Sequence, residues 1–139
     1  MNNPNRSILS KKYLYMEEIH DRVVREIVSH LNNKSFDIYI NPGQEKNAGI
    51  GDNYPDVVMT EKGRNTVKFI LEVETEDSVT KEEAINQWKK YTSEINATFY
   101  LVVPAALLNR AKELCQRENI NSRYATYSIS GSALTFDFQ

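Results

Sequence analysis

The pattern of apolar and polar positions predicts helices and strands in a mixed order along the chain. Between Ser10 and Leu31, apolar side chains recur at the spacing of an amphipathic helix. Residues 36–40 alternate between apolar and polar, which is typical of a strand with one buried face. Two further strands are predicted over 56–60 and 67–74, and the second of these is apolar on both faces for most of its length. The first half therefore reads as one helix followed by three strands.

The second half of the chain predicts crossovers between strands. Thr80 and Glu83 fit a capping box at the start of a helix that runs to about Ile95. The remaining predicted elements are a buried strand, a helix and two short strands, over 98–103, 105–118, 123–127 and 133–138. A strand, helix, strand succession requires a crossover connection. The simplest arrangement is an α/β fold with a single mixed β-sheet flanked by helices on both faces.

Length and composition limit the class of protein. The 139 residues fit one domain, expected over 1–139 with a flexible arm over 1–10. No stretch approaches the roughly 18 apolar residues that cross a bilayer, so we expect no membrane partner. The polar first residues lack the apolar core of a signal peptide, and a cytoplasmic protein is expected. The formal charge of −2 excludes a generally basic nucleic-acid coat protein, but a local basic face remains open.

Several residues that often mark function have a simpler explanation here. The single Cys115 excludes an internal disulfide and predicts a packing residue. Trp88 falls on the apolar stripe of its helix, which favours core packing. His20 and His30 are ten positions apart on the first helix, hence on roughly opposite faces, and both are predicted at the surface.

Three acidic residues stand at neighbouring strand ends. Asp56 begins the second predicted strand, and Glu72 and Glu74 end the third. Side chains alternate across a strand, so Glu72 and Glu74 point to one face. If these strands pair antiparallel through a turn near Gly63, Asp56 lies beside Glu72. A buried carboxylate is costly without compensation, and a divalent cation would provide it.

The chemistry of such a site points to phosphodiester hydrolysis. Mg²⁺ prefers oxygen ligands and commonly takes one or two carboxylates. Asp56 and Glu72 would supply these, with the Val73 carbonyl as a third ligand, and Mn²⁺ is the alternative ion. A bound metal lowers the pKa of its water and stabilises charge developing on a phosphate. The simpler alternative is that acids at strand ends are solvated or paired with lysines.

Three short motifs follow in order along the chain, and together they resemble a known family. The motifs are Pro55-Asp56, Glu72-Val73-Glu74 and Gln87-Trp88-Lys89-Lys90-Tyr91. The first two resemble the motif of the PD-(D/E)XK nuclease superfamily, which has the restriction-endonuclease-like fold. The third is similar to the Gln-x-x-x-Tyr element of its RecB-type and phage-exonuclease-type branches. The resemblance covers about 13–103 and includes the order of the predicted elements.

The resemblance implies a role for each matching residue. It implies that Asp56 and Glu72 bind the metal, and that Glu74 takes the position of the family's lysine, which positions and activates the attacking water. It implies that Gln87 and Tyr91 line the site or touch the nucleic-acid backbone. Some family members add an acid from the first helix, and Glu17 is the candidate for it here.

One departure from the family's pattern concerns the missing lysine. Glu74 cannot donate to a phosphate, although it can accept a proton from water or help to hold a second metal ion. Lys68 lies on the same strand but is more than about 12 Å from Glu72 along it, too far to replace the lysine. Other cations that could reach the site or frame a phosphate path are Lys46, Lys62, Arg64, Lys81, Lys89 and Lys90. These are equally well explained as solvated charges.

Two functions of different classes follow. The first is a metal-dependent nuclease that hydrolyses DNA, with specificity supplied by a homodimer or a partner protein because the chain is short. The second is a catalytically inactive nuclease-fold protein that serves as a binding or assembly module. The missing lysine and the acidic charge balance favour the second. A third possibility is an α/β domain whose acids are ordinary surface charges.

Overall fold

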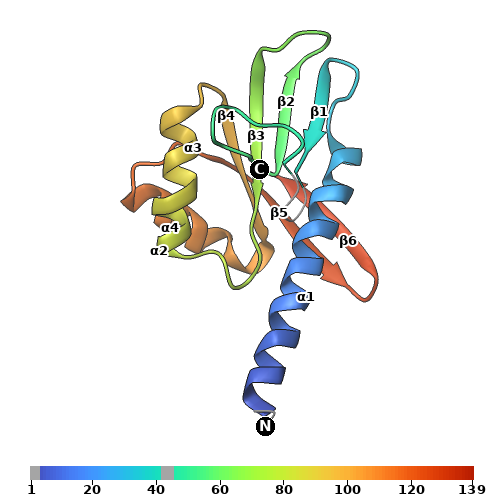
Figure 1. Cartoon of the computed structure of the whole chain (residues 1–139), viewed down its shortest axis with the longest axis vertical. Coiled ribbons are helices and arrows are strands. Elements are labelled where there is room, and N and C mark those ends of the chain that lie inside the picture. The colour runs from blue at the N-terminus through green and yellow to red at the C-terminus, as the bar shows by residue number, and fades with distance from the viewer. Residues whose placement is uncertain (1–3, 42–45) are drawn as a thin grey trace.

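Six strands form one mixed sheet whose order follows the chain from β1 to β6 (Figure 1). The computed structural model describes the backbone of residues 4–41 and 46–139, and side chains from Leu14 onward within these ranges. The strands β1 to β6 are Phe36–Ile40, Val57–Glu61, Val67–Val73, Thr98–Pro104, Arg123–Ser130 and Ala133–Phe138. Neighbours pair antiparallel except β3 with β4 and β4 with β5, which are parallel. The predicted α/β class with a single mixed sheet is confirmed.

The N-terminal helix is longer than the sequence predicts. The helix α1 is Pro4–Ile27, and a 3₁₀ turn, η1, continues it over Val28–His30. The predicted flexible arm over 1–10 is therefore helical from Pro4, while residues 1–3 lie outside the described part of the chain. Proline suits the first position of a helix because the N–H that it lacks has no partner there. Among residues 4–41 and 46–139, no helix is long and apolar enough to cross a membrane.

The helical stretch between β3 and β4 contains a π-helical segment. It consists of α2 (Lys81–Glu83), η2 (Ala84–Trp88) and α3 (Lys89–Glu94), which follow one another without a break. The side chain of Thr80 accepts a hydrogen bond of 3.2 Å from the backbone N–H of Glu83, which is one of the two bonds of the predicted capping box, while the N–H of Thr80 donates to the carbonyl of Ser78. π-helical turns are rare and are frequent at functional sites. This one carries Gln87 and Trp88.

The second crossover runs from β4 to β5. It contains a 3₁₀ turn, η3 (Ala105–Leu107), and the helix α4 (Leu108–Arg117). The chain then forms the hairpin of β5 and β6, and Gly131 turns it with a φ of 60°. L side chains rarely adopt this conformation, so glycine suits the turn. Both parallel strand pairs are thus joined through helices, as the order of predicted elements implies.

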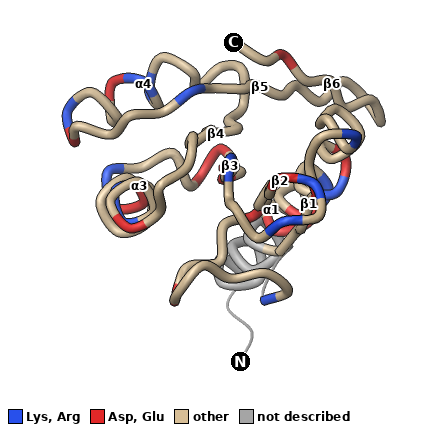
Figure 2. Tube along the Cα trace, turned by 90° about the horizontal axis from the view of Figure 1, so that it is seen from above, with Lys and Arg blue, Asp and Glu red and all other residues tan. Residues whose placement is uncertain are grey.

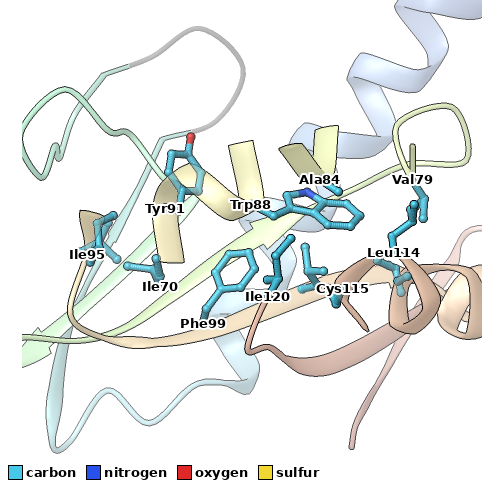
Figure 3. Packing of buried hydrophobic residues seen from close by; sticks show 14 residues of the cluster. Ile70, Val79, Ala84, Trp88, Tyr91, Ile95, Phe99, Leu114, Cys115 and Ile120 are labelled. Carbon is cyan, nitrogen blue, oxygen red and sulfur yellow. The ribbon is translucent and has the colours of Figure 1, made fainter. Parts of the chain in front are cut away.

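The buried side chains form two clusters, and the central strands contribute to both. Val57 of β2 packs in the cluster that includes Val24 of α1. The next residue, Val58, packs in the cluster that includes Trp88 of η2 and Leu114 of α4 (Figure 3). Burying a side chain of this size stabilises the fold by about 1.5–3 kcal/mol. Neighbouring residues of β2 therefore belong to different clusters, as expected for side chains that alternate along a strand.

The turn between β2 and β3 determines which residues meet at the site. Gly63 lies in this turn with a φ of 72°. The strands pair antiparallel, with Val57 opposite Leu71. The start of β2 therefore lies beside the end of β3, which is the geometry that the sequence predicts for the acidic residues.

Candidate functional site

Asp56 and Glu72 lie together, joined by hydrogen bonds between two strands. The backbone N–H of Asp56 donates to Oε1 of Glu72 over 3.0 Å. In return, the backbone N–H of Val73 donates to Oδ2 of Asp56 over 2.7 Å. The side chains of Asp56 and Glu72 are buried, with 7% and 5% of their surface exposed. Each carboxylate is thus held in place by the backbone of the other strand.

His20 of α1 also contacts this site. Its Nε2 is 3.1 Å from Oδ2 of Asp56, and its Nδ1 is 3.1 Å from Oδ1 of Asp21. The prediction that His20 lies at the surface is wrong, because the ring is half-buried between two carboxylates. His20 precedes the buried Val23 and Val24 by three and four positions, so it lies on their helix face. That spacing could have indicated a buried position.

The two carboxylates keep His20 charged. Burial by itself lowers the pKa of His20, but the hydrogen bonds and charges of Asp56 and Asp21 outweigh it and raise the pKa to about 9. The ring is therefore an imidazolium at neutral pH. It supplies one positive charge beside Asp56 but leaves Glu72 and Glu74 uncompensated.

The pKa values of Glu72 and Glu74 are raised. Burial raises the pKa of Glu72 well above its usual range, and the charges of Asp56 and Glu74 add to this effect. Burial also raises the pKa of Glu74 to about 8, although hydrogen bonds from Ser78 and Trp88 act against it. Excess negative charge in a low-dielectric site favours bound protons or a bound cation. In the absence of a cation, the site holds protons.

Glu74 is held from two sides. Its Oε1 accepts a hydrogen bond of 2.7 Å from Nε1 of Trp88, and its backbone oxygen accepts one of 2.7 Å from the hydroxyl of Tyr127. Trp88 is fully buried, as predicted, and its indole nitrogen lies on the ring edge turned away from Cys115 (Figure 3). The sequence pattern predicts the packing of Trp88 but not this hydrogen bond. It singles out no role for Tyr127.

Gln87 and Tyr91 reach the same pocket as the acids. With its amide nitrogen toward the acids, Gln87 donates to Oε2 of Glu72 over 2.9 Å and to Oε2 of Glu83 over 3.1 Å. Tyr91 lines the pocket, and its hydroxyl points away from the apolar cluster (Figure 3). Burial and the charge of Glu72 raise the pKa of Tyr91, so its hydroxyl stays neutral. Glu83 was missed because the sequence shows it only as a helix cap.

These side chains line a pocket of about 400 Å³. Figure 2 shows acidic positions at the end of β3, between α1 and the helical stretch that contains α3. Glu17, the predicted accessory acid, lines the pocket with an exposed side chain, but His20 makes the contact from α1 to Asp56. Asp77 also lines the pocket. The described lining therefore includes seven acidic residues: Glu17, Asp21, Asp56, Glu72, Glu74, Asp77 and Glu83.

The carboxylate oxygens of the pocket suit a cation that keeps several of its water ligands, rather than one whose ligands all come from the protein. Within the described residues, no group of three or more His, Cys, Asp or Glu side chains is arranged to hold a metal ion. Mg²⁺ commonly takes only one or two carboxylates and keeps several waters. Asp56 and Glu72 provide that number, with oxygen ligands of the kind that Mg²⁺ or Mn²⁺ prefers. Val73 lines the pocket too, and a metal contact of its carbonyl stays a prediction.

The candidate lysines fall in different places. Lys68 lies at the other end of β3, where its Nζ is 3.5 Å from Oε1 of Glu61. Among the described pocket residues, none of Lys81, Lys89 or Lys90 is present, whereas Lys46 is. The sequence pattern could not distinguish Lys46, because the loop that carries it has no regular spacing.

Comparison with models of known protein families, with curated proteins and with solved structures gives no match to this chain.

Proposed function

We propose that this chain is a divalent-metal-dependent nuclease of the PD-(D/E)XK superfamily that hydrolyses DNA phosphodiester bonds. The observation that carries the proposal is that Asp56 and Glu72 lie side by side in the lining of one pocket. The backbone N–H of Asp56 donates to Oε1 of Glu72 over 3.0 Å. The proposal includes a restriction-endonuclease-like fold with helices on both faces of the sheet. The two apolar clusters support that arrangement, since one includes α1 and the other includes η2, α3 and α4.

In this proposal, Asp56 and Glu72 hold Mg²⁺ or Mn²⁺, with the Val73 carbonyl as a third ligand. When bound, the ion lowers the pKa of a coordinated water and stabilises negative charge on the phosphate. The N–H of Val73 fixes the orientation of Asp56, and the amide of Gln87 does the same for Glu72. Such hydrogen bonds keep ligands in one geometry and are themselves important for metal affinity.

Glu74 is the residue proposed to accept the proton of the attacking water. It lines the pocket with the two ligands, and a carboxylate can act as a general base. Its Oε1 accepts a hydrogen bond from the indole of Trp88, which fixes the orientation of the carboxyl group. Gln87 and Tyr91 line the pocket on the side where the nucleic-acid backbone is proposed to lie.

The charge of the pocket makes the proposed activity depend strictly on metal. Seven acidic side chains line the pocket, and a phosphodiester adds a further negative charge. Like charges brought together in a partly buried site repel strongly, because the local dielectric is low. DNA should therefore enter only with a divalent cation bound.

A second candidate function is a catalytically inactive binding or assembly module with the same fold. The observation that favours it is the engagement of Glu74 by Trp88 at the position where the family has a lysine. A carboxyl group held in this way can serve stability alone. In either case, a homodimer or a partner protein is proposed to supply specificity.

Calorimetric titration with Mn²⁺ tests the metal site without requiring the right substrate. We expect Asp56→Asn and Glu72→Gln to abolish Mn²⁺ uptake. The control Glu82→Gln changes an exposed acid outside the pocket lining and should bind Mn²⁺ like wild type.

Cleavage of labelled single-stranded, duplex and branched DNA with Mg²⁺ or Mn²⁺ is the second measurement. Absence of both uptake and cleavage in the wild type would reject the nuclease, and uptake without cleavage of any form would favour the binding module.

A further inference from the structure

The pocket contains one side chain of permanent positive charge among its described residues. Lys46 is the single lysine or arginine in that lining, which also includes seven acidic residues. The family's lysine is absent, since Glu74 takes its place. A phosphate that enters this pocket would gain a charge-assisted hydrogen bond from a cationic side chain of the protein.

The ammonium group of Lys46 lies over an aromatic ring at the pocket. Its Nζ lies 5.1 Å from the centre of the Tyr54 ring, and both residues line the pocket. A cation over an aromatic ring is attracted to the ring face by about 0.5–1 kcal/mol at exposed sites. The ring carries no net charge, so the ammonium keeps its donors for an anionic ligand.

The loop is built so that the Tyr54 ring can take this position. A Cβ atom at Gly49 would lie 2.6 Å from Cε1 of Tyr54, well inside van der Waals contact. Only glycine leaves room for the ring to pack so closely on the loop. Lys46 and Gly49 therefore both lie against the ring of Tyr54.

Asn41 anchors this loop to the backbone that carries Asp56. Its Oδ1 accepts hydrogen bonds from the N–H groups of Asn47 and Ala48, over 2.7 and 2.8 Å. Its Nδ2 donates to the carbonyls of Ala48 and Pro55, each over 2.7 Å. The backbone N–H of Asn41 donates to the backbone carbonyl oxygen of Asp56 over 2.9 Å. The residues that follow Lys46 and the proposed metal ligand Asp56 are thus both hydrogen-bonded to one buried residue, Asn41.

We infer that Lys46 contacts the phosphate of the substrate in this pocket and supplies the cationic contact that Glu74 cannot make. The inference rests on the proposed nuclease function. It takes the recognised group to be a phosphate of the nucleic-acid backbone, which an ammonium on a flexible stem binds as a point charge. Lys46 is therefore expected to raise affinity for nucleic acid without selecting a sequence.

The test compares Lys46→Met, Lys46→Arg and the matched control Lys81→Met, which removes an exposed lysine outside the pocket. The probes are a fluorescent oligothymidylate and a fluorescent hairpin duplex, bound in Ca²⁺ and followed by anisotropy over a range of salt concentrations. We expect Lys46→Met to weaken binding about three- to tenfold. The salt slope, by which we mean the slope of the logarithm of the binding constant against the logarithm of salt concentration, should become shallower by about 0.7–0.9, the effect of one lost phosphate contact. Lys46→Arg should restore both values, and Lys81→Met should change neither.

Mn²⁺ titration of the same variants separates the two proposals. The inference requires that Lys46→Met still take up Mn²⁺, since Lys46 is not a ligand. If the wild type binds the probes and Lys46→Met binds them with the same affinity and salt slope, the inference on Lys46 is overturned and the nuclease proposal stands. Loss of Mn²⁺ uptake in Lys46→Met would show a role in building the site and would also overturn the inference. A wild type that takes up no Mn²⁺ and binds neither probe would reject both.

Discussion

The indole nitrogen of Trp88 donates a hydrogen bond of 2.7 Å to Oε1 of Glu74, and both side chains are almost fully buried. This bond joins the π-helical segment η2 to the end of β3. It fixes one oxygen of Glu74, the acid that is proposed to accept the proton of the attacking water. Because Trp88 is the only tryptophan of the chain, its indole is also a specific reporter for the site.

Replacing Trp88 with Phe should destabilise the fold through Glu74. The change keeps most of the ring but removes the N–H, which leaves a buried carboxyl without its donor. We expect the free energy of unfolding to fall by about 2 kcal/mol, measured by urea unfolding followed by circular dichroism. In the Glu74→Leu background, the same replacement should cost at least about 1 kcal/mol less. Additive effects of the two changes would contradict a direct interaction.

The stability of the metal-free protein should fall as pH rises from the acidic to the alkaline range. The folded state raises the pKa of Glu74 from 4.5 to about 8 and that of His20 from 6.5 to about 9. Between pH 4.5 and about 8 for Glu74, and between pH 6.5 and about 9 for His20, the folded state binds more protons than the unfolded state. The free energy of unfolding therefore decreases as pH rises through these ranges. We expect a total loss on the order of a few kcal/mol, measured by urea unfolding in EDTA at several pH values.

Two variants separate the contributions to this profile. Glu74→Gln keeps an oxygen for the indole of Trp88 but cannot titrate, so the loss between pH 4.5 and about 8 should shrink. His20→Gln should remove the loss between pH 6.5 and about 9. A wild-type stability that stays level or increases across both windows would show that these groups are not perturbed as described.

Metal uptake should release protons and tighten with pH. The pKa of Glu72 is raised by burial and by its acidic neighbours, and a carboxyl group must lose its proton to bind a metal ion. If one proton is displaced, the affinity for Mn²⁺ increases about tenfold for each pH unit. Calorimetry in two buffers of different ionisation enthalpy measures the number of protons released. Equal affinity at acidic and alkaline pH would contradict the proposed displacement.

Gly49→Ala should weaken nucleic-acid binding without removing the metal site. The added methyl group would lie 2.6 Å from the ring of Tyr54, so the ring must move and Lys46 loses its support. We expect the affinity for the fluorescent oligothymidylate to fall about as much as in Lys46→Met, while Mn²⁺ uptake stays unchanged. Gly51→Ala is unsuitable as a control because Gly51 has a φ of 61°. Asp52→Asn, an exposed change in the same loop, is the matched control and should bind like wild type.

Local patterns were sufficient to predict the elements of the sheet. The β strands at 36–40, 57–61 and 67–73 agree with their predicted ranges to within about one residue, because alternation and turn residues act over short distances. The turn at Gly63 and the antiparallel pairing that follows from it place the start of β2 next to the end of β3. This is why the meeting of Asp56 with Glu72 could be predicted from a single chain.

The partners of the acids required the tertiary structure. Where α1 crosses the sheet decides that His20, and not Glu17, contacts Asp56. The π-helical segment decides that the indole nitrogen of Trp88 meets Glu74, although its apolar spacing predicts packing alone. Lys46 lines the pocket beside Asn47 and Ala48, whose N–H groups donate to the side chain of Asn41. By itself, the sequence determined the strands and the acids at their ends, since these depend on neighbours in the chain; the groups around the acids come from distant segments, and only packing in three dimensions decided which of them arrive.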